Sequence, residues 1–397
     1  MTDQAAKYAR KLVNTLKADG DLHDPRLERA FLEIPRHIFL PDTPVEMAYA
    51  NDAIPIKRDG AGNITSSVSQ PAIMAQMIDQ LKLESGHNVL EIGTASGYNA
   101  ALLLHMVGNG GRVTSVELDR DLVELAKDRL QRAQVGGDIT VVQNDGAYGY
   151  APRASYDRII ATVGVWDVPP AWERQLKPGG ILVTPIWLEA MQVSAAFKLQ
   201  TDGTLISDDN RPCWFVRLRG ADAGPVITAR VGNTSLEMIS TEAHKIDGAA
   251  LLWLMNDWSE NNTLDMPMKY SSLFGGLLPY LTQHTPQDCV LAYYSINDET
   301  KPYGLSGTGF ALLLQGSACF VSFNQRGESV CFGSSDAFIL MQDGLTAWRQ
   351  AGEPGIDRLR LRLIPKDNRT MDVQNGRLFT RSYHYLQVWF ADKTDAL

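Results

Sequence analysis

Apolar residues recur at helical spacing near the start of the chain. Residues 5–33 and the stretch after Gln70 both place apolar side chains three and four positions apart, which is typical of helices packed on one side. Asp24 followed by Pro25 predicts the start of a second helix, because proline fits the first helical turn. Residues 34–70 contain four prolines and are expected to be irregular. The apolar positions are Ala6, Leu12, Leu16, Leu27, Ala30 and Phe31, then Ile73, Met74, Met77, Ile78 and Leu81.

From residue 88 the pattern changes to short apolar runs that alternate with amphipathic stretches. Such repeated strand–helix units fold into a parallel sheet with helices on both faces. The pattern therefore predicts an α/β, doubly wound, Rossmann-like domain over residues 1–220. Lys177–Gly180 predicts a type II turn before the last strand. Strands are expected at 88–92, 112–117, 139–144, 157–163 and 181–187, and helices at 97–107, 119–133 and 168–176.

The alternation stops near residue 218, and Ala221–Pro225 has the composition of a boundary. The remaining pattern mixes helices and strands without the regular repeat. We therefore expect an α+β accessory domain over residues 221–397. Its helices are expected at 248–258 and 335–350, and its strands at 310–314, 318–323, 358–364 and 385–390.

Length and charge narrow the classes of protein. A chain of 397 residues suggests two domains, and 44% hydrophobic with 21% charged residues is ordinary for a globular protein. A net charge of −9 argues against a nucleic-acid partner. No apolar run approaches the roughly 18 residues of a membrane span, and the start shows no apolar signal region, so a cytoplasmic protein is expected. The four cysteines show no CxxC pair, so neither metal nor disulfides are expected.

The stretch Val89-Leu-Glu-Ile-Gly-Thr-Ala-Ser-Gly-Tyr98 carries the clearest functional signal. It predicts a buried strand, a turn with glycines at Gly93 and Gly97, and then a helix. Glu117 follows at the end of the next apolar run. A glycine turn after one strand and an acid at the tip of the next is how an open α/β sheet holds a ribose.

The spacing of the glycines in this turn distinguishes between possible ligands. A nicotinamide fingerprint would need glycine at Ala95 and Tyr98, so a dehydrogenase fits poorly. S-adenosylmethionine, which has no pyrophosphate to bind, suits the spacing better. Two alternatives remain, a turn that only packs strand against helix and a binding protein that keeps the pocket without turnover.

Three further segments lie where such a site would need them. Asn144-Asp-Gly146 ends the third strand, where an adenine edge could be bound. Ser69 precedes a helix, and its hydroxyl could face the site or simply cap that helix. The loop 163–169 follows the fourth strand and should overhang the same edge.

Taken together, the motifs resemble those of protein-L-isoaspartate O-methyltransferases over roughly residues 5–218. The separate pieces are short, but their order and spacing are specific. They are Pro35-Arg-His-Ile-Phe-Leu-Pro41, Tyr49, Ala53-Ile-Pro-Ile56, Ser67-Val-Ser-Gln-Pro71, Val89–Tyr98, Asn144-Asp-Gly146 and Gln175–Gly180.

The resemblance implies a role for each matching residue. Ser69 would be the active-site residue, and with Ser67 it would face both the methionine part of S-adenosylmethionine and the substrate carboxylate. Glu117 would bind the ribose, and the product would be S-adenosylhomocysteine. Glu91 would hold the methionine part, Gly93 and Gly97 would lie in the cofactor loop, and Asp145 and Gly146 would contact adenine. Val68 and Ser96 are further implied cofactor contacts.

The chain also departs from the family pattern. Ala95 replaces one glycine, and Val163–Pro169 replaces an alanine-rich segment. The C-terminal half has no counterpart in the short repair enzymes and resembles a longer bacterial branch associated with modified-peptide gene clusters. The expected partner is a protein or peptide with an aspartyl or isoaspartyl residue, methylated on its carboxylate and converted to a succinimide. Trp166 and Asp167 are predicted to contact this substrate, or Trp166 packs against the added domain.

Overall fold

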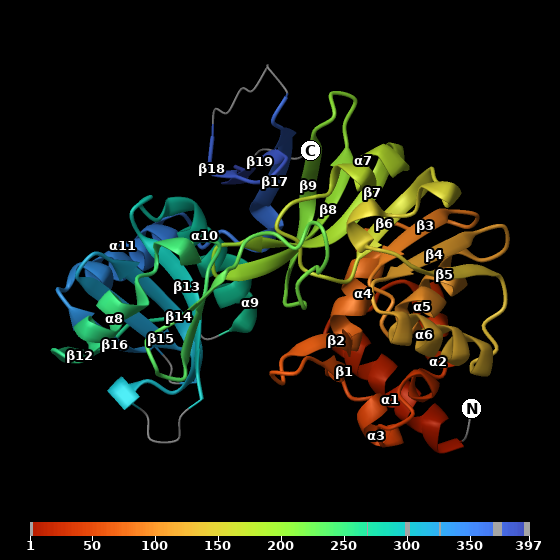
Figure 1. Ribbon diagram of the computed structural model, residues 1–397, viewed down its shortest axis with the longest axis horizontal. Coiled ribbons are helices and arrows are strands. Elements are labelled where there is room, and N and C mark those ends of the chain that lie inside the picture. Colours follow the sequence, from red (N-terminus) through yellow and green to blue (C-terminus); the bar gives the residue numbers. More distant parts are fainter. Residues whose placement is uncertain (1–2, 268, 298–301, 325–326, 368–374, 393–397) are drawn as a thin grey trace.

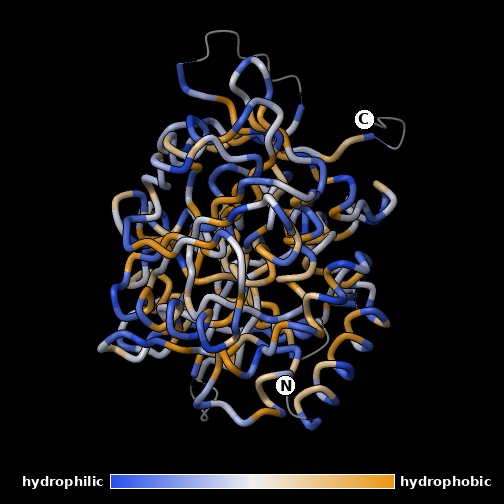
Figure 2. The backbone as a smooth tube through the Cα atoms, turned by 90° about the vertical axis from the view of Figure 1, so that its right-hand side faces the viewer, coloured by the Kyte–Doolittle hydropathy of each residue, from blue (hydrophilic) through white to orange (hydrophobic). Residues whose placement is uncertain are grey.

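The computed structural model describes residues 3–267, 269–297, 302–324, 327–367 and 375–392. The ribbon forms two lobes, and long strands in the middle of the chain extend from one lobe toward the other (Figure 1). Hydrophobic positions gather inside the molecule, while hydrophilic ones follow its outline (Figure 2). None of the helices in these ranges has both the length and the apolar character to cross a membrane.

The two N-terminal helices confirm the predicted periodicity. Helix α1 (Asp3–Ala18) buries one side, which includes Ala5, Ala9, Leu12, Val13 and Leu16. Helix α2 (Pro25–Glu33) starts after Asp24, whose carboxylate accepts a hydrogen bond from the Arg26 N–H at 2.7 Å. The predicted Asp-Pro start therefore works through a side-chain cap as well as through proline.

The prediction that residues 34–70 are irregular is wrong in part. The segment contains a two-stranded antiparallel sheet of β1 (Ile54–Arg58) and β2 (Ile64–Val68). Pro55 fits because this small sheet leaves one side of β1 unpaired, where a missing N–H breaks no bond. The short helical elements before and after this sheet are η1 (Arg36–Phe39), α3 (Val45–Ala48) and α4 (Pro71–Gln80).

A ten-stranded sheet forms the centre of the larger lobe, in the order β18-β19-β17-β9-β8-β7-β6-β3-β4-β5. Strands β3 to β7 pair in parallel, as predicted, and pairing is antiparallel from β7 to β18. The strands are β3 (Asn88–Ile92), β4 (Arg112–Glu117), β5 (Asp138–Gln143), β6 (Tyr156–Ala161), β7 (Leu176–Leu188), β8 (Met191–Leu199), β9 (Leu205–Cys213), β17 (Leu359–Pro365), β18 (Arg377–Thr380) and β19 (His384–Phe390). The intervening helices are α5 (Tyr98–Val107), α6 (Arg120–Arg132), η2 (Gly146–Tyr148), η3 (Ala151–Arg153) and α7 (Pro170–Gln175).

The segment Lys177–Gly180, predicted as a turn before a strand, lies inside β7. Pairing with β6 jumps from Leu176 to Ile181, so these residues form an irregularity in the ladder. Gly179 has φ +73°, the value that the third position of a type II turn needs. The local geometry therefore follows the prediction, although the strand begins earlier.

The second lobe is built on a seven-stranded antiparallel sheet, in the order β10-β11-β13-β14-β15-β16-β12. Its helix α8 ends at Met255 rather than at the predicted residue 258, because the chain turns into β12. The strands are β10 (Thr228–Arg230), β11 (Leu236–Ile239), β12 (Ser259–Thr263), β13 (Val290–Ile296), β14 (Gly307–Leu314), β15 (Ser317–Ser322) and β16 (Glu328–Gly333). The helices are η4 (Ala243–Lys245), α8 (Gly248–Met255), α9 (Tyr270–Ser272), η5 (Leu273–Leu277), α10 (Leu278–His284), η6 (Pro302–Gly304), α11 (Asp336–Gln350) and η7 (Ile356–Arg358).

The division into residues 1–220 and 221–397 stays a prediction, and the sheet pairing limits it. Strand β17 pairs with β9, with Leu361 opposite Ser207, so β17–β19 extend the first sheet. The alternation predicted for this strand explains the fit, because Leu359, Leu361 and Leu363 are fully buried. One hydrophobic cluster runs through both lobes.

Candidate functional site

The glycine turn lies at the point where the order of the parallel strands reverses. Strand β3 has β4 on one side and β6 on the other, and ligands of open α/β sheets bind at the carboxyl ends of such strands. Gly93 has φ +97°, and a Cβ there would lie 2.6 Å from Thr162 Oγ1. Gly97 (φ +88°) begins α5, while Ser96 is buried in the turn. Ala95 also adopts a left-handed φ of +50°, a conformation that glycine takes more easily.

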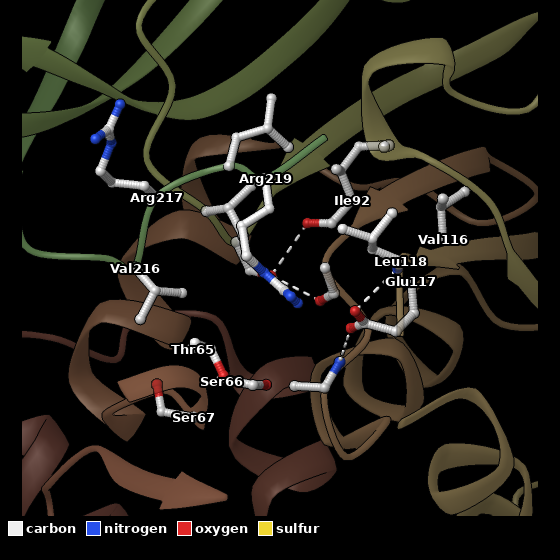
Figure 3. A pocket seen from close by; sticks show the side chains of 16 residues that line it. Thr65, Ser66, Ser67, Ile92, Val116, Glu117, Leu118, Val216, Arg217 and Arg219 are labelled. Atoms are coloured by element: carbon white, nitrogen blue, oxygen red, sulfur yellow. Dashed lines mark hydrogen bonds between the residues drawn. The ribbon is translucent and has the colours of Figure 1, made fainter. Parts of the chain in front are cut away.

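A pocket opens at this edge between the glycine turn, β4, β2 and a later segment of the chain (Figure 3). Four of the predicted site residues line it: Ser67, Gly93, Glu117 and Gly146. The other lining residues are Thr65, Ser66, Ile92, Ala95, Val116, Leu118, Thr162, Val163, Val216, Arg217, Leu218 and Arg219. The predicted residues Val68, Ser69, Glu91, Ser96, Gly97 and Asp145 are not among the residues that line it.

Glu117 joins the tip of β4 to the glycine turn. Its side chain is 7% exposed, and one carboxylate oxygen accepts a hydrogen bond from the Ala95 N–H at 3.0 Å. The other oxygen accepts from the N–H groups of Leu118 and Asp119, at 2.9 and 3.2 Å. These bonds fix the carboxylate at the pocket wall, where it could accept further bonds from hydroxyl groups.

Glu91 lies behind the turn, fully buried in β3. Its carboxylate accepts hydrogen bonds from Asn99 Nδ2 at 2.8 Å and from the Ser115 hydroxyl. Burial raises the pKa of Glu91 to about 7, although both hydrogen bonds oppose this shift. In this arrangement Glu91 braces α5 and β4, and its implied contact with the cofactor stays a prediction.

Asp145 and Gly146 follow β5 as predicted. The Asp145 carboxylate accepts hydrogen bonds from the Ala147 N–H at 2.9 Å and from the Ala221 N–H at 2.7 Å. A Cβ at Gly146 would lie 2.6 Å from Ile92 Cγ2, so only glycine fits there without rearrangement. Gly146, the first residue of η2, therefore lets the turn after β5 lie close to the end of β3 at the pocket edge.

The three predicted site residues at the end of β2 and just before α4 lie in different surroundings. Ser67 lines the pocket, Val68 is 3% exposed in the core, and Ser69 is half-buried just before α4. The interpretation of Ser69 as a helix cap is wrong, because Gln70 occupies the N-cap position. The N–H of Ala72 is instead bound by Asn51 Oδ1 at 3.0 Å.

Residues 214–221, which we call the strap, were not among the predicted site residues. Two hydrogen bonds hold it to the loop after β6, from the Gly164 N–H to Val216 O (2.8 Å) and from the Leu218 N–H to Gly164 O (2.9 Å). Arg219 reaches from the strap into the pocket, whereas Arg217 points away from its centre (Figure 3). The two arginines lie a few residues after Cys213, where β9 ends, but their spacing alone could not show which edge they would cover.

A network of four charged side chains links the strap to β1 and to the start of α6, with Asp121 Oδ1 2.7 Å from Lys57 Nζ. Asp119 lies 2.8 Å from Arg219 Nη2 and 2.9 Å from Lys57 Nζ. The hydrogen bonds from Arg219 chiefly keep the pKa of Asp119 below its ordinary value. Thr162 was also missed, and its hydroxyl donates to the Gly93 carbonyl at 2.7 Å. Its position at the carboxyl end of β6 was the available signal.

Trp166 and Asp167 face the C-terminal strands. Asp167 is 4% exposed, and its Oδ1 lies 2.7 Å from His384 Nδ1. The Arg381 guanidinium lies over the Trp166 ring, 3.9 Å from its centroid. These contacts support the alternative in which Trp166 packs against the added segment, and the predicted substrate contact has no support from the geometry.

Known proteins resemble the N-terminal half of this chain. The model of the family "Protein-L-isoaspartate(D-aspartate) O-methyltransferase (PCMT)" matches residues 7–223. A protein-L-isoaspartate O-methyltransferase of Methanopyrus kandleri is 36% identical over 221 residues, which are 55% of this chain and 95% of that protein. The enzyme of Methanococcoides burtonii is 40% identical over 209 residues, 53% of this chain and 98% of that protein.

One solved structure with the same enzyme name also covers the second lobe. It aligns with 89% of this chain and 96% of its own, with a TM-score of 0.52 and 24% sequence identity, so the likeness concerns the fold. The family match spans more than half of the chain and includes the glycine turn, β4 and the strap. The chain therefore belongs to the protein-L-isoaspartate(D-aspartate) O-methyltransferase family.

Proposed function

We propose that this chain transfers a methyl group from S-adenosylmethionine to the carboxylate of an isoaspartyl or aspartyl residue in a protein or peptide. The observation that carries the proposal is the pair formed by the glycine turn and Glu117. They lie at the carboxyl ends of the neighbouring parallel strands β3 and β4, inside the segment that matches the family.

The residues around the pocket fit such a cofactor. Gly93 and Gly97 give the turn its left-handed backbone, and without side chains there the backbone itself would contact the ligand. Glu117 would accept hydrogen bonds from the ribose hydroxyls, and Gly146 with Leu218 above it would border the adenine. When bound, S-adenosylmethionine supplies a methyl group on a positively charged sulfur.

The substrate side needs little acid–base chemistry. An aspartyl or isoaspartyl carboxylate has a reference pKa near 4, so it is already ionised at neutral pH. Ser67 and Ser69 would orient it by hydrogen bonds, as positioning groups rather than nucleophiles. The strap would exclude water, and alignment would supply most of the acceleration.

The ester product has a defined fate. The next backbone nitrogen attacks the ester carbonyl, methanol leaves with the nitrogen's proton, and a succinimide remains. Ring hydrolysis then gives a mixture of aspartyl and isoaspartyl products. The same steps serve the repair of damaged protein or the modification of a dedicated peptide.

Ligand binding and turnover test the proposal separately. Calorimetry should detect S-adenosylhomocysteine, and binding of NAD alone would favour a dehydrogenase. A peptide with one isoaspartyl residue should take up labelled methyl groups and release them as methanol.

Ser69→Ala should lower kcat about tenfold or more and leave S-adenosylhomocysteine affinity nearly unchanged. Tight cofactor binding without methylation of either an isoaspartyl or an aspartyl peptide would indicate a binding protein instead.

A further inference from the structure

Arg36 is a buried cation to which the proposed methyl transfer assigns no role. Its side chain is 0% exposed, at the start of η1, within the Pro-Arg-His motif. Burial lowers its pKa to about 10, so the guanidinium stays protonated at neutral pH. None of the ion pairs in the described ranges of the chain includes it, so its charge faces neutral partners.

The neutral partners of Arg36 include one on the Ser69 side of the site and one beside the glycine turn. Arg36 Nε donates to Ala48 O at 2.8 Å, and Nη2 donates to Ser69 O at 2.9 Å. Nη1 contacts Met74 Sδ in α4 at 3.5 Å. The guanidinium carbon also lies 5.0 Å from the centroid of the Tyr98 ring. Tyr98 is the first residue of α5, directly after Gly97 of the glycine turn.

We propose that Arg36 is a positioning residue that holds Ser69 in register with the glycine turn. The inference rests on the proposed function, in which Ser69 orients the carboxylate and the turn holds the cofactor. Methyl transfer depends on the alignment of two reactants, and small displacements are costly. A rigid, planar guanidinium that contacts both supports would fix their separation.

Replacement of Arg36 by an apolar residue distinguishes this positioning role from simple packing. A buried charge with only neutral partners loses hydration that those partners restore incompletely, so an apolar side chain of similar length is often tolerated as well or better. If Arg36 only supported packing, Arg36→Met should lower Tm, since the Ala48 and Ser69 carbonyls lose a donor, but the folded variant should keep its turnover. If it sets the position of Ser69, the variant should fold but lose turnover.

Arg158 offers a matched control. Its guanidinium also donates to backbone carbonyls, those of Leu81 at 2.5 Å and Lys82 at 3.1 Å. It sits near the amino end of β6, whereas the pocket lies at the carboxyl ends of the strands. Arg158→Met therefore removes comparable hydrogen bonds away from the pocket.

The experiment compares the full-length wild type with Arg36→Met, Arg36→Lys and Arg158→Met. For each we would measure kcat and KM on an isoaspartyl peptide, S-adenosylhomocysteine affinity by calorimetry, and Tm. We expect kcat to fall 10- to 100-fold in Arg36→Met, with affinity within threefold of wild type. Arg36→Lys, which keeps the charge but cannot span both carbonyls, should recover part of kcat. Arg158→Met should keep kcat within twofold below its own Tm.

Three results would overturn the inference. The first is a folded Arg36→Met with kcat within twofold of wild type. The second is an equal loss of kcat in Arg158→Met, and the third is a loss of kcat that parallels loss of S-adenosylhomocysteine binding. If Arg36→Met does not fold, Arg36→Lys decides by the same criteria. A wild type without turnover would instead show that the proposed function has failed, and Ser69→Ala measured alongside shows whether Ser69 matters at all.

Discussion

The Glu117 carboxylate stabilises the glycine turn and is also proposed to bind the ribose of the cofactor. It binds the Ala95 N–H of the glycine turn and forms part of the pocket wall. We predict that Glu117→Ala weakens S-adenosylhomocysteine binding by about 1.5–3 kcal/mol, because charge-assisted hydrogen bonds to the ribose are lost. Calorimetry on the purified variant measures this directly.

Glu124 provides the control, since it is an exposed acid on α6. Glu124→Ala should bind with wild-type affinity. If Glu117→Ala also binds normally while its Tm falls, Glu117 only braces the turn and the ribose is bound by other residues.

At the scale of elements, His384 ties β19 to the loop after β6 and to α7. It is 2% exposed, with Nδ1 2.7 Å from Asp167 and Nε2 3.0 Å from Glu173. Burial opposes the charged form, but the two carboxylates outweigh it and raise the pKa of His384 to about 9. Because the folded pKa exceeds the unfolded value near 6.5, this contribution is complete below pH 6.5 and is lost as pH rises through 9.

We therefore predict that the free energy of unfolding falls between pH 6.5 and 9.5, by on the order of 3 kcal/mol relative to His384→Gln. Urea unfolding at a series of pH values measures the difference between the two proteins. His23→Gln, at an exposed position, should follow the wild-type curve. Parallel curves for wild type and His384→Gln would mean that the pKa of His384 does not rise on folding.

At the scale of the whole molecule, the second half of the chain completes the first. A chain cut after residue 220 would lose β17 from β9 and the His384 partner of Asp167. It would also lose the Ala221 N–H that binds Asp145. We predict that this truncation lowers Tm by at least about 10 °C, because buried leucines of the shared cluster become exposed. S-adenosylhomocysteine affinity should fall with it.

Removal of only residues 393–397 is the matched control and should change neither quantity. Thermal unfolding monitored by circular dichroism, with calorimetry of the same samples, tests both truncations. A 1–220 chain with full-length Tm and affinity would show that the C-terminal strands add nothing to the first lobe.

The sequence alone determined the parts of the fold that depend on local patterns. Val89, Leu90 and Ile92 predicted β3, and Val113 and Val116 predicted β4, in both cases with the bounds observed. Gly93 and Gly97 marked a turn with left-handed backbone, where side chains are strained. Glu117 was placed at the pocket by the same local logic.

Tertiary structure decided what depends on distant segments meeting. Asp167 and His384 are 217 positions apart, and nothing near either residue shows that they pair. The strap crosses the pocket only because β9 runs antiparallel beside β8 and ends there. Likewise, an alternating strand such as β17 shows which face is buried but not which sheet it joins, since any free strand edge offers the same backbone groups. The pairing with β9 is settled by the packing of both lobes around one core.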